Sequence, residues 1–400
     1  MVKHSRDVGL LAGLVYFTQG ALGITGVALP LFLRDLNWKV SEITTVASLA
    51  AIPWTLKIIY GLLSDCFPLF GFRRKSYLMV FACISALGWL SLILLPPEKH
   101  WILLSLLLAN LGFAATDVIT DGFIVEHSRG LSSHLYQSIA WGTRSLGAIV
   151  SGVTGGWLAE HWQNKNVFLI AVFLPLPVIL VAYHILEKKM ERGPFHSAIE
   201  PLKRCLKILF LPNLRWFILL LFIVTLSSSF GVPFFFYMKE TLGFKETLLG
   251  GLVSLGWLGA VIASLLYGKW LSKISPKLIL RAAILINCIN ILSTLLIQDA
   301  RSAFVIIFIG GMMSCITILP IMSVSAMLTH HSGVEGSLFA ILMSIFNLGQ
   351  ICFGFFGGKL YPFTGLYPLI WVTGIVSLGG LWVVAKLDFN PIPRTADEKG

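Results

Sequence analysis

The chain has 400 residues, of which 56% are hydrophobic and only 12% are charged, and its formal net charge is +11. A soluble domain usually carries about 25% charged residues, so this composition excludes an ordinary soluble protein. A basic charge can indicate nucleic-acid binding, but the positions of the lysines and arginines, described below, fit a membrane protein instead.

Twelve apolar runs follow one another along the chain, and each is close to the roughly 20 residues that a helix needs to cross a bilayer. They cover residues 8–33, 41–64, 76–95, 101–125, 134–159, 166–186, 214–238, 247–271, 277–297, 301–328, 337–358 and 366–386. The longest polar stretch, 187–213, separates the first six runs from the last six. Within it, residues 199–211 could form an amphipathic helix on the cytoplasmic surface.

These runs predict an all-α membrane protein with 12 transmembrane helices in two pseudo-symmetric six-helix bundles. The bundles are expected at residues 1–186 and 214–388, with a cytoplasmic linker at 187–213 and a cytoplasmic tail at 389–400. If the N-terminus is cytoplasmic, about two-thirds of the 30 lysines and arginines fall in cytoplasmic segments, as the positive-inside rule requires. We therefore expect both termini on the cytoplasmic side, and no nucleic-acid partner.

Several kinds of site are absent from the sequence. Its six cysteines form no CxxC pair and mostly fall inside apolar runs, so they are interpreted as small apolar residues, not as disulfides or metal ligands. No phosphate-binding loop indicates an ATP-driven pump, and no Ser/His/Asp or metal-ligand constellation indicates an enzyme. The first apolar run is also too long for the core of a signal peptide. We expect no catalytic residue, no metal and no cofactor.

The two halves of the chain repeat one another. Three pairs of segments match in the same order at nearly one offset: 145–158 with 347–360, 32–35 with 237–240, and 60–64 with 267–272. In the first pair, SLGAIVSGVTGGWL and NLGQICFGFFGGKL, four glycines coincide at a constant offset of 202. Matching runs lie six places apart, an even number, so both halves have the same orientation in the membrane. This parallel repeat is the arrangement of major facilitator transporters.

Four segments resemble those of the folate–biopterin transporter family, a branch of the major facilitator superfamily. They are PWTLKIIYGLLSDCFPLFGFRRKSYL (53–78), TDVITDGFIVEHSRG (116–130), QSIAWGTRSLGAIVSG (137–152) and GVEGSLFAILMSIFNLG (333–349). The resemblance covers essentially the whole membrane domain, although the family favours Ala-Thr where this chain has Gly336-Ser337. It implies proton-coupled uptake of pterin-containing molecules. Some members carry other metabolites, including S-adenosylmethionine, so the family name does not fix the cargo.

The chain lacks the long termini and loops of protozoan members of this family. It is similar to a minimal bacterial version, so we expect a multi-pass protein of the bacterial inner membrane that works as a monomer.

Four ionisable residues lie inside the apolar runs, where a charge is costly and marks a functional site by default. Lys57 lies on the second run, Asp117 and Asp121 lie four residues apart on one face of the fourth, and Arg144 lies on the fifth. In one interpretation Arg144 and Lys57 hold a substrate anion, while the aspartates bind a pterin ring or carry the coupling proton. In the other, the charges are simply paired, Asp117 with Arg144 and Lys57 with Asp121.

A second charged group follows the second run. Gly61, Leu63, Asp65, Arg73 and Arg74 resemble the GxLxD…R(R/K) loop of major facilitators. An acid at a helix end and a basic loop could latch the two halves on the cytoplasmic face, and we predict this gating role for Asp65, Arg73 and Arg74. The alternative is plain positive-inside anchoring. Neither interpretation expects these side chains to contact substrate.

A pterin ring is flat and aromatic, so its site should supply stacking faces and a few amide groups. Trp54 and Trp141 are candidates because they lie near the charges, and Gln19, Phe234 and Asn347 are candidates on the first, seventh and eleventh runs. For each aromatic residue the alternative is core packing or lipid contact.

Two further residues have a plain structural interpretation. Glu126 is interpreted as a loop or helix-cap residue, and Pro233 is expected to kink the seventh run.

Together these features predict a secondary active transporter that moves folate or pterin-type metabolites by alternating access, with uptake driven by protons. One alternative is a transporter of a different cargo, such as S-adenosylmethionine, an amino-acid conjugate or a siderophore-like anion, and another is an exporter. A third alternative, from a different class of protein, is a non-transporting membrane receptor or assembly subunit. Charges buried along the expected path argue against that class.

Overall fold

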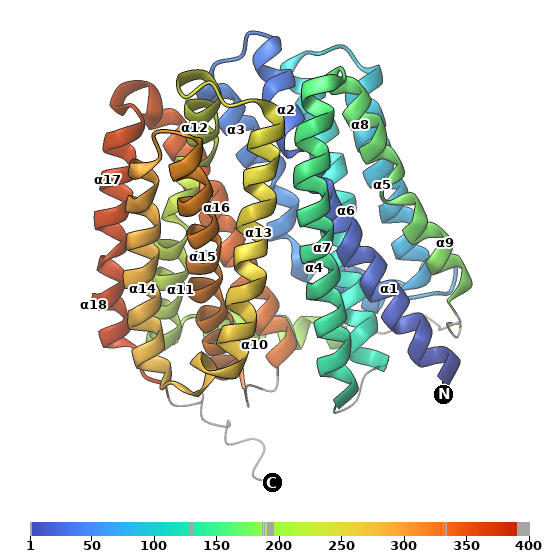
Figure 1. Ribbon diagram of the computed structural model, residues 1–400. Coiled ribbons are helices and arrows are strands. Elements are labelled where there is room, and N and C mark those ends of the chain that lie inside the picture. Colours follow the sequence, from blue (N-terminus) through green and yellow to red (C-terminus); the bar gives the residue numbers. More distant parts are fainter. Residues whose placement is uncertain are drawn as a thin grey trace. The chain divides into compact units, whose positions relative to one another are not determined.

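A computed structural model describes residues 2–127, 131–185, 187, 189, 196–330, 332 and 334–389. Helices make up nearly all of this part of the chain (Figure 1), and its residues form no strand beyond one isolated bridge between Leu69 and Phe72. The predicted tail 389–400 lies almost entirely outside the described residues. The predicted all-α fold is confirmed.

The helices of the first half begin with α1 (Val2–Ala21), α2 (Thr25–Asp35), α3 (Val40–Ala50), α4 (Lys57–Cys66) and α5 (Lys75–Leu94). They continue with α6 (Lys99–His127), α7 (Leu131–His161), α8 (Asn164–Phe173) and α9 (Leu176–His184). Three of the first six predicted runs coincide with one helix each, α5, α6 and α7. The other three are divided between two helices, α1 with α2, α3 with α4 and α8 with α9.

The second half begins with α10 (His196–Leu209), α11 (Pro212–Val224), α12 (Gly231–Phe236) and α13 (Glu246–Lys269). It ends with α14 (Pro276–Ser293), α15 (Ala300–Thr329), α16 (Glu335–Thr364), α17 (Leu366–Ser377) and α18 (Gly379–Lys386). The helix α10 lies where the linker was predicted to form an amphipathic helix.

The chain divides into two compact units. The first unit comprises Met1–Pro194 and Phe235–Trp257, and the second comprises Phe195–Phe234 and Leu258–Gly400. The segment Phe235–Trp257, which includes the first half of α13, therefore groups with the first unit although it lies in the second half of the sequence. The bundle boundaries at residues 186, 213 and 388 stay a prediction.

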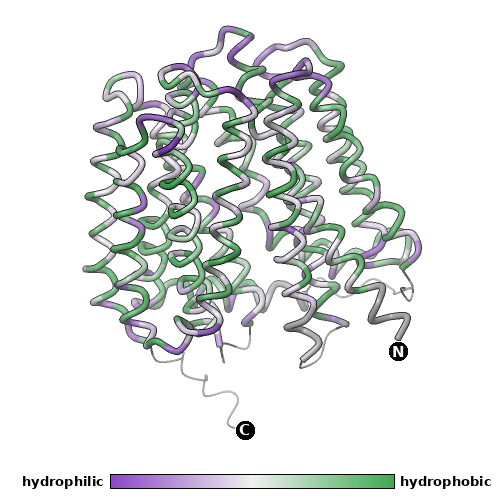
Figure 2. The backbone as a smooth tube through the Cα atoms, in the orientation of Figure 1, coloured by the Kyte–Doolittle hydropathy of each residue, from purple (hydrophilic) through white to green (hydrophobic). Residues whose placement is uncertain are grey.

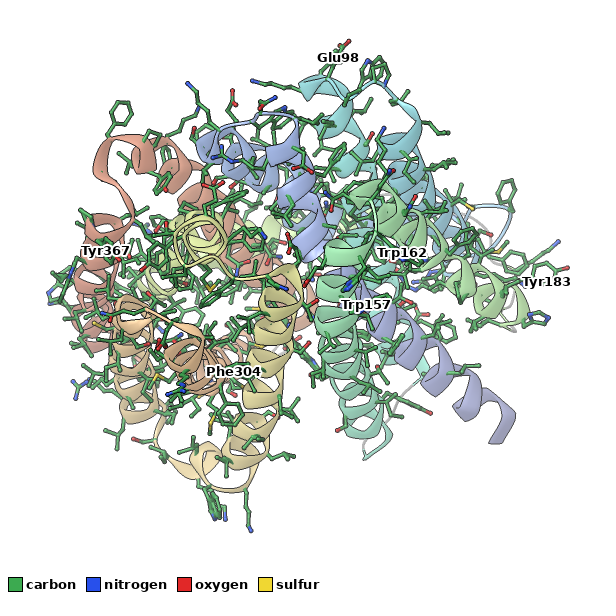
Figure 3. The ribbon with its side chains drawn as sticks, turned by 45° about the horizontal axis from the view of Figure 1, so that its top comes forward. Glu98, Trp157, Trp162, Tyr183, Phe304 and Tyr367 are labelled. Carbon is green, nitrogen blue, oxygen red and sulfur yellow. The ribbon has the colours of Figure 1, made fainter. Side chains whose placement is uncertain are left out.

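Ten helices or interrupted helices among the described residues are long and apolar enough to cross a membrane, and eleven if a pair bent by 83° at residues 209–212 counts as one span. The helix α7, 31 residues long, occupies the predicted fifth run. Hydrophilic stretches gather at the ends of the helices (Figure 2). Many large apolar side chains are exposed, among them Trp157, Trp162, Tyr183, Phe304 and Tyr367 (Figure 3). Such exposure is expected where lipid replaces water.

Several of the spans are interrupted for identifiable reasons. A short 3₁₀ turn at Ile52–Thr55 contains Pro53, which cannot donate a backbone hydrogen bond and so ends α3 before α4 begins. The seventh span breaks at Leu226–Ser229, and this break ends four residues before Pro233. A proline cannot donate to the carbonyl oxygen four residues earlier and its ring clashes with that carbonyl, so the break lies where the kink predicted at Pro233 would fall. Pro233 itself lies in the first turn of α12.

The repeat found in the sequence corresponds to a backbone contact that occurs once in each half of the chain. The first span is interrupted at Leu22–Ile24 and the seventh at Leu226–Ser229. A Cβ on Gly155 of α7 would collide with the backbone of Ile24, and one on Gly357 of α16 would collide with the backbone of Ser229. In each half, therefore, a glycine of the fifth helix packs directly on the break in the first, and each contact lies within one unit.

Polar contacts attach the segment Phe235–Trp257 to the rest of the first unit. The Nε atom of Arg34 lies 2.7 Å from Oε1 of Glu240. The Ser254 hydroxyl donates a 2.5 Å hydrogen bond to the carbonyl oxygen of Ile149 on α7. The first half of α13 consequently has a defined register against α7.

Candidate functional site

The carboxylate of Asp117 on α6 has a polar partner at each of its two oxygens. It is 4% exposed, and its Oδ2 atom lies 2.7 Å from the Nζ of Lys57, while Gln19 donates a 3.2 Å hydrogen bond to Oδ1. Lys57 is the first residue of α4, so the interruption at Pro53 places its side chain at the point where the helix restarts. The pairing differs from the one considered in the sequence analysis, since Lys57 contacts Asp117 and not Asp121.

The second acid, Asp121, has different surroundings. The hydroxyl of Tyr16 donates a 2.6 Å hydrogen bond to its Oδ1 atom, and no lysine or arginine of the described residues lies within ion-pair distance. Tyr16 and Gln19 stand three residues apart on α1 and reach the two acids that stand four apart on α6. The two acids thus share a face, as predicted, but only Asp117 is neutralised by a cation.

The cation Arg144 of α7 has no acidic partner among the described residues. Its guanidinium carbon lies 5.1 Å from the ring centroid of Trp141 and 6.0 Å from that of Trp257. The predicted pair of Asp117 with Arg144 is therefore wrong, because Lys57 occupies that position. Trp257, on the first half of α13, was missed by sequence reasoning.

Trp54 belongs to the surroundings of Lys57. Its indole N–H donates a 2.9 Å hydrogen bond to Oδ1 of Asn110, and the Lys57 Nζ lies 5.4 Å from the ring centroid. Both contacts hold the indole beside the ammonium group. Trp54, Lys57, Gln19, Asp117, Asp121, Arg144 and Trp141 all lie in the first unit, and we call these seven residues with Tyr16 and Trp257 the charged cluster.

Two predicted site residues lie in the second unit. Phe234 is on α12, where its ring makes an edge contact with Phe230 at a centroid distance of 6.5 Å. Asn347 is on α16 and is half-buried. Their participation in the same site as the charged cluster stays a prediction.

The predicted gating residues form one ionic network at the end of α4. The Arg73 Nη2 atom lies 2.7 Å from Asp65 Oδ1, and the Arg74 Nη2 atom lies 2.8 Å from the same oxygen. Arg74 also contacts Glu126, which lies in the last turn of α6, at 2.6 Å. Arg74 is only 5% exposed, and its Nη1 donates to the Ser64 hydroxyl at 2.6 Å.

The acids of this network keep Arg73 charged. Burial disfavours the charged form of its guanidinium, but the hydrogen bond to Asp65 and the negative charges of Glu126 and Asp65 outweigh burial and raise the pKa of Arg73. The Arg73 guanidinium therefore remains charged at every physiological pH.

Glu187 anchors the loop that carries these arginines. Its carboxylate accepts hydrogen bonds from three successive backbone N–H groups, those of Arg73 at 2.9 Å, Arg74 at 3.0 Å and Lys75 at 2.8 Å. These amides belong to the N-terminal end of α5, where backbone donors have no intrahelical acceptor and a negative charge is favourable. Sequence reasoning placed Glu187 in the linker and gave it no role.

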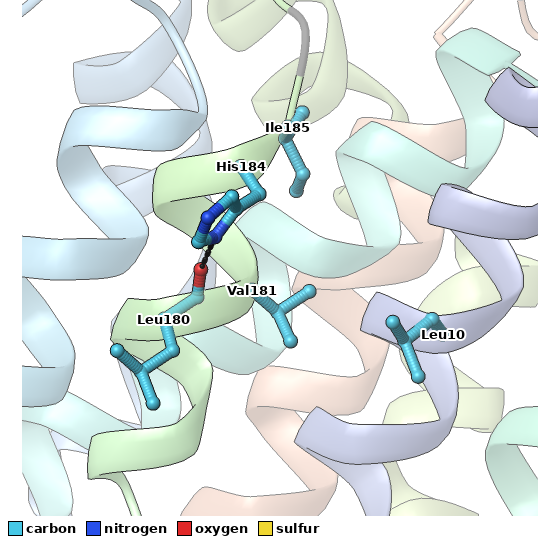
Figure 4. A pocket seen from close by; sticks show the side chains of 5 residues that line it. All are labelled: Leu10, Leu180, Val181, His184 and Ile185. Carbon is cyan, nitrogen blue, oxygen red and sulfur yellow. Dashed lines mark hydrogen bonds between the residues drawn. The ribbon is translucent and has the colours of Figure 1, made fainter.

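Other features of the molecule do not resemble a site. A cavity of about 220 Å³ between α1 and α9 is lined by Leu10, Leu180, Val181, His184 and Ile185 (Figure 4). Its walls are mostly apolar. The Nδ1 atom of His184 contacts the carbonyl oxygen of Leu180 in the same helix, α9. In the described part of the chain, no group of three or more His, Cys, Asp or Glu side chains could hold a metal ion.

The sequence was compared with known families and proteins. The sequence model described as the BT1 family matches residues 19–369. A folate-biopterin transporter of Synechocystis is 29% identical over 84% of this chain and 71% of its own length. Folate transporter 1 of Plasmodium falciparum is 27% identical over 87% and 72%, and probable folate-biopterin transporter 7 of Arabidopsis thaliana is 27% identical over 91% and 88%.

Solved structures share the fold at low sequence identity. A POT family transporter in complex with 5-aminolevulinic acid has a TM-score of 0.77 at 11% identity, with 95% of each chain covered. A nucleoside transporter has a TM-score of 0.75 at 13% identity, covering 95% of this chain and 98% of the other. The predicted major facilitator fold is confirmed.

Proposed function

This chain belongs to the BT1 family, and on that premise we propose that it carries a folate or pterin-type metabolite across the membrane by proton-coupled uptake. The family consists of transporters and not of enzymes, and the apolar helices make the chain a multi-pass membrane protein. The cargo, the coupling ion and the direction of transport belong to the proposal.

The observation that carries the proposal is the charged cluster. Lys57, Asp117 and Asp121 lie inside helices that are apolar enough to cross a bilayer, and Arg144 lies on α7. Unpaired charge is costly inside a membrane and marks a substrate or ion pathway. One pair, Lys57 with Asp117, is neutral. Asp121 and Arg144 have no ion-pair partner among the described residues, so one acid and one cation stay open to ligands.

Asp121 is the proposed proton carrier. Asp117 is held by Lys57 and Gln19, and protonating it would break a 2.7 Å ion pair. Asp121 accepts a hydrogen bond from the neutral Tyr16 hydroxyl, and this bond can persist when the other carboxylate oxygen takes up a proton. A group that gains and loses a proton without breaking an ion pair suits a coupling role.

The proposal also includes the transport cycle. The network of Asp65, Arg73 and Arg74 acts as a latch on the cytoplasmic face during alternating access, with both chain termini on that side. The protein works as a monomer in a bacterial inner membrane and needs no cofactor besides the coupling proton.

The test is uptake into proteoliposomes that contain the purified protein, with an imposed pH gradient and radiolabelled folic acid. We expect accumulation that follows the gradient and collapses with a protonophore. Asp121→Asn should abolish accumulation, while Glu98→Gln, at a side chain that is 61% exposed, should leave it intact. Gradient-driven accumulation by Asp121→Asn at the parent rate would remove Asp121 from the coupling mechanism.

The cargo is tested separately by thermal denaturation with a panel of folates, pterins, S-adenosylmethionine and amino acids. A true ligand stabilises the folded state by mass action. We expect folates or pterins to raise the melting temperature. A shift with S-adenosylmethionine or an amino-acid conjugate alone would replace the folate proposal, and no shift with any compound would favour the receptor or assembly subunit.

A further inference from the structure

Arg144 combines a full positive charge with unused hydrogen-bonding capacity. It is half-buried on α7, and none of the described residues offers its guanidinium a carboxylate or a hydrogen-bond acceptor. A guanidinium carries five N–H donors in a planar fork that matches a carboxylate. Elsewhere in the first unit, arginines that are at least half-buried meet acids, as Arg73 and Arg74 do.

Two indole rings take the place of an acid beside Arg144. The ring centroids of Trp141 and Trp257 lie 5.1 and 6.0 Å from its guanidinium carbon. An aromatic face attracts a cation, but it accepts no conventional N–H···O hydrogen bond. The rings therefore favour the charged group and hold its position while leaving its donors free.

The position of Trp257 is set by very close helix packing. Gly152 of α7 lies so near Gly250 of α13 that a Cβ on either glycine would collide with the backbone of the other helix. The Ser254 hydroxyl, one turn before Trp257, donates to the Ile149 carbonyl at 2.5 Å. With the backbones in register, a tryptophan at residue 257 falls beside Arg144, so the three side chains form a fixed arrangement.

The other end of the charged cluster offers acceptors. Gln19 uses its N–H₂ group on Asp117, and its buried Oε1 atom has no hydrogen-bond partner. The backbone of α1 at Gly20 also abuts the backbone of α7 at Arg144. Acceptors for ring amino groups and a donor fork for an anion thus stand on neighbouring turns of α1 and α7.

We propose that Trp141, Arg144 and Trp257 form the subsite for the substrate's carboxylate, and that this subsite makes the transporter select carboxylate-bearing pterins over pterins that lack a carboxylate. The inference rests on the proposed function. The carboxylate binds the guanidinium edge in a bidentate manner, and Trp257 is a positioning residue that acts through Arg144. Both tryptophans also exclude water from the ion pair.

The test measures binding of two probes to the purified full-length protein by titration calorimetry: folic acid, which carries a glutamate tail, and 6-hydroxymethylpterin, which has no carboxylate. The parent should bind folic acid at least about tenfold more tightly, the size expected for one charge-assisted contact. Arg144→Gln should remove this preference by weakening folic acid binding alone. Trp257→Leu should reduce the preference, and Trp257→Phe, which keeps an aromatic face, should restore most of it.

Matched controls are Arg301→Gln at an exposed helix start and Trp371→Leu at a tryptophan that is 52% exposed. Arg144→Lys keeps the charge but loses the fork, so it should fall between the parent and Arg144→Gln, and it guards against a folding defect in the neutral variant. A parent that binds both probes, with the same preference in Arg144→Gln, would overturn the subsite but leave the proposed function standing. A parent that binds neither probe would overturn both.

Discussion

Removing the carboxylate of Glu187 should destabilise the protein measurably. In Glu187→Ala, three N–H groups at the start of α5, which now donate at 2.8–3.0 Å, lose their acceptor. A hydrogen bond to a charged group contributes about 1.5–3 kcal/mol, but water can reach this half-buried site and satisfy part of the loss. We therefore expect a net loss of about 2–3 kcal/mol, well below the sum of three bonds.

The assay is thermal denaturation of the purified protein in detergent. For a unit of roughly 200 residues, each kcal/mol lowers the melting temperature by about 2–4 °C, so Glu187→Ala should melt about 4–12 °C below the parent. Glu187→Gln keeps one carbonyl acceptor and should lose about half as much. Glu98→Ala, at an exposed surface acid, is the control and should change little. A melting temperature of Glu187→Ala within 1 °C of the parent would refute the anchoring argument.

Three further predictions concern packing and ion pairs, each checked by the same melting assay. Gly357→Ala should destabilise by about 1–3 kcal/mol because its methyl group would overlap the backbone at the break in the seventh span, whereas Gly142→Ala, with open space around it, should be neutral or stabilising. Loss of stability in both variants alike would contradict this packing account. Arg34 and Glu240 are 41% and 42% exposed, so a double-mutant cycle should give a coupling of only about 0.2–1 kcal/mol. Arg74→Lys should cost more than about 2 kcal/mol, since a lysine cannot reproduce the fork that a buried arginine uses, and a change below 0.5 kcal/mol would contradict the network's structural role.

The sequence predicts the helices well because apolar runs of bilayer length have few alternative structures. It also predicts the repeat, since the spacing of the glycines is the same in both halves of the sequence. The interruption at Pro53 could have been anticipated from the missing N–H of proline. The break at Leu226–Ser229 could have been anticipated in the same way, because Pro233 cannot donate to the carbonyl oxygen of Ser229, four residues earlier.

Within the site, helical spacing placed Asp117 and Asp121 on one face, but it could not assign their partners. Lys57 reaches Asp117 because of how α4 is set against α6, and register between separate helices is not encoded in either one alone. Glu187 and Trp257 were missed for the same reason. Glu187 offered one weak signal, an acid next to a basic linker. Gly250 offered another, since a small residue permits the close approach that brings Trp257 to Arg144.

The paired glycine contacts of the two halves show how a duplicated protein can diverge. Tyr267-Gly268 keeps the small motif of Tyr60-Gly61, yet the second half has no counterpart of Lys57 or Asp65. Where backbone touches backbone, as at Gly155 and Gly357, a side chain would collide with the neighbouring helix, and both halves have a glycine. The ionic residues meet no such requirement and occur in one half only. The molecule is therefore symmetric in its architecture and asymmetric in its chemistry, and substitutions in the two halves should have different consequences for activity but similar ones for folding.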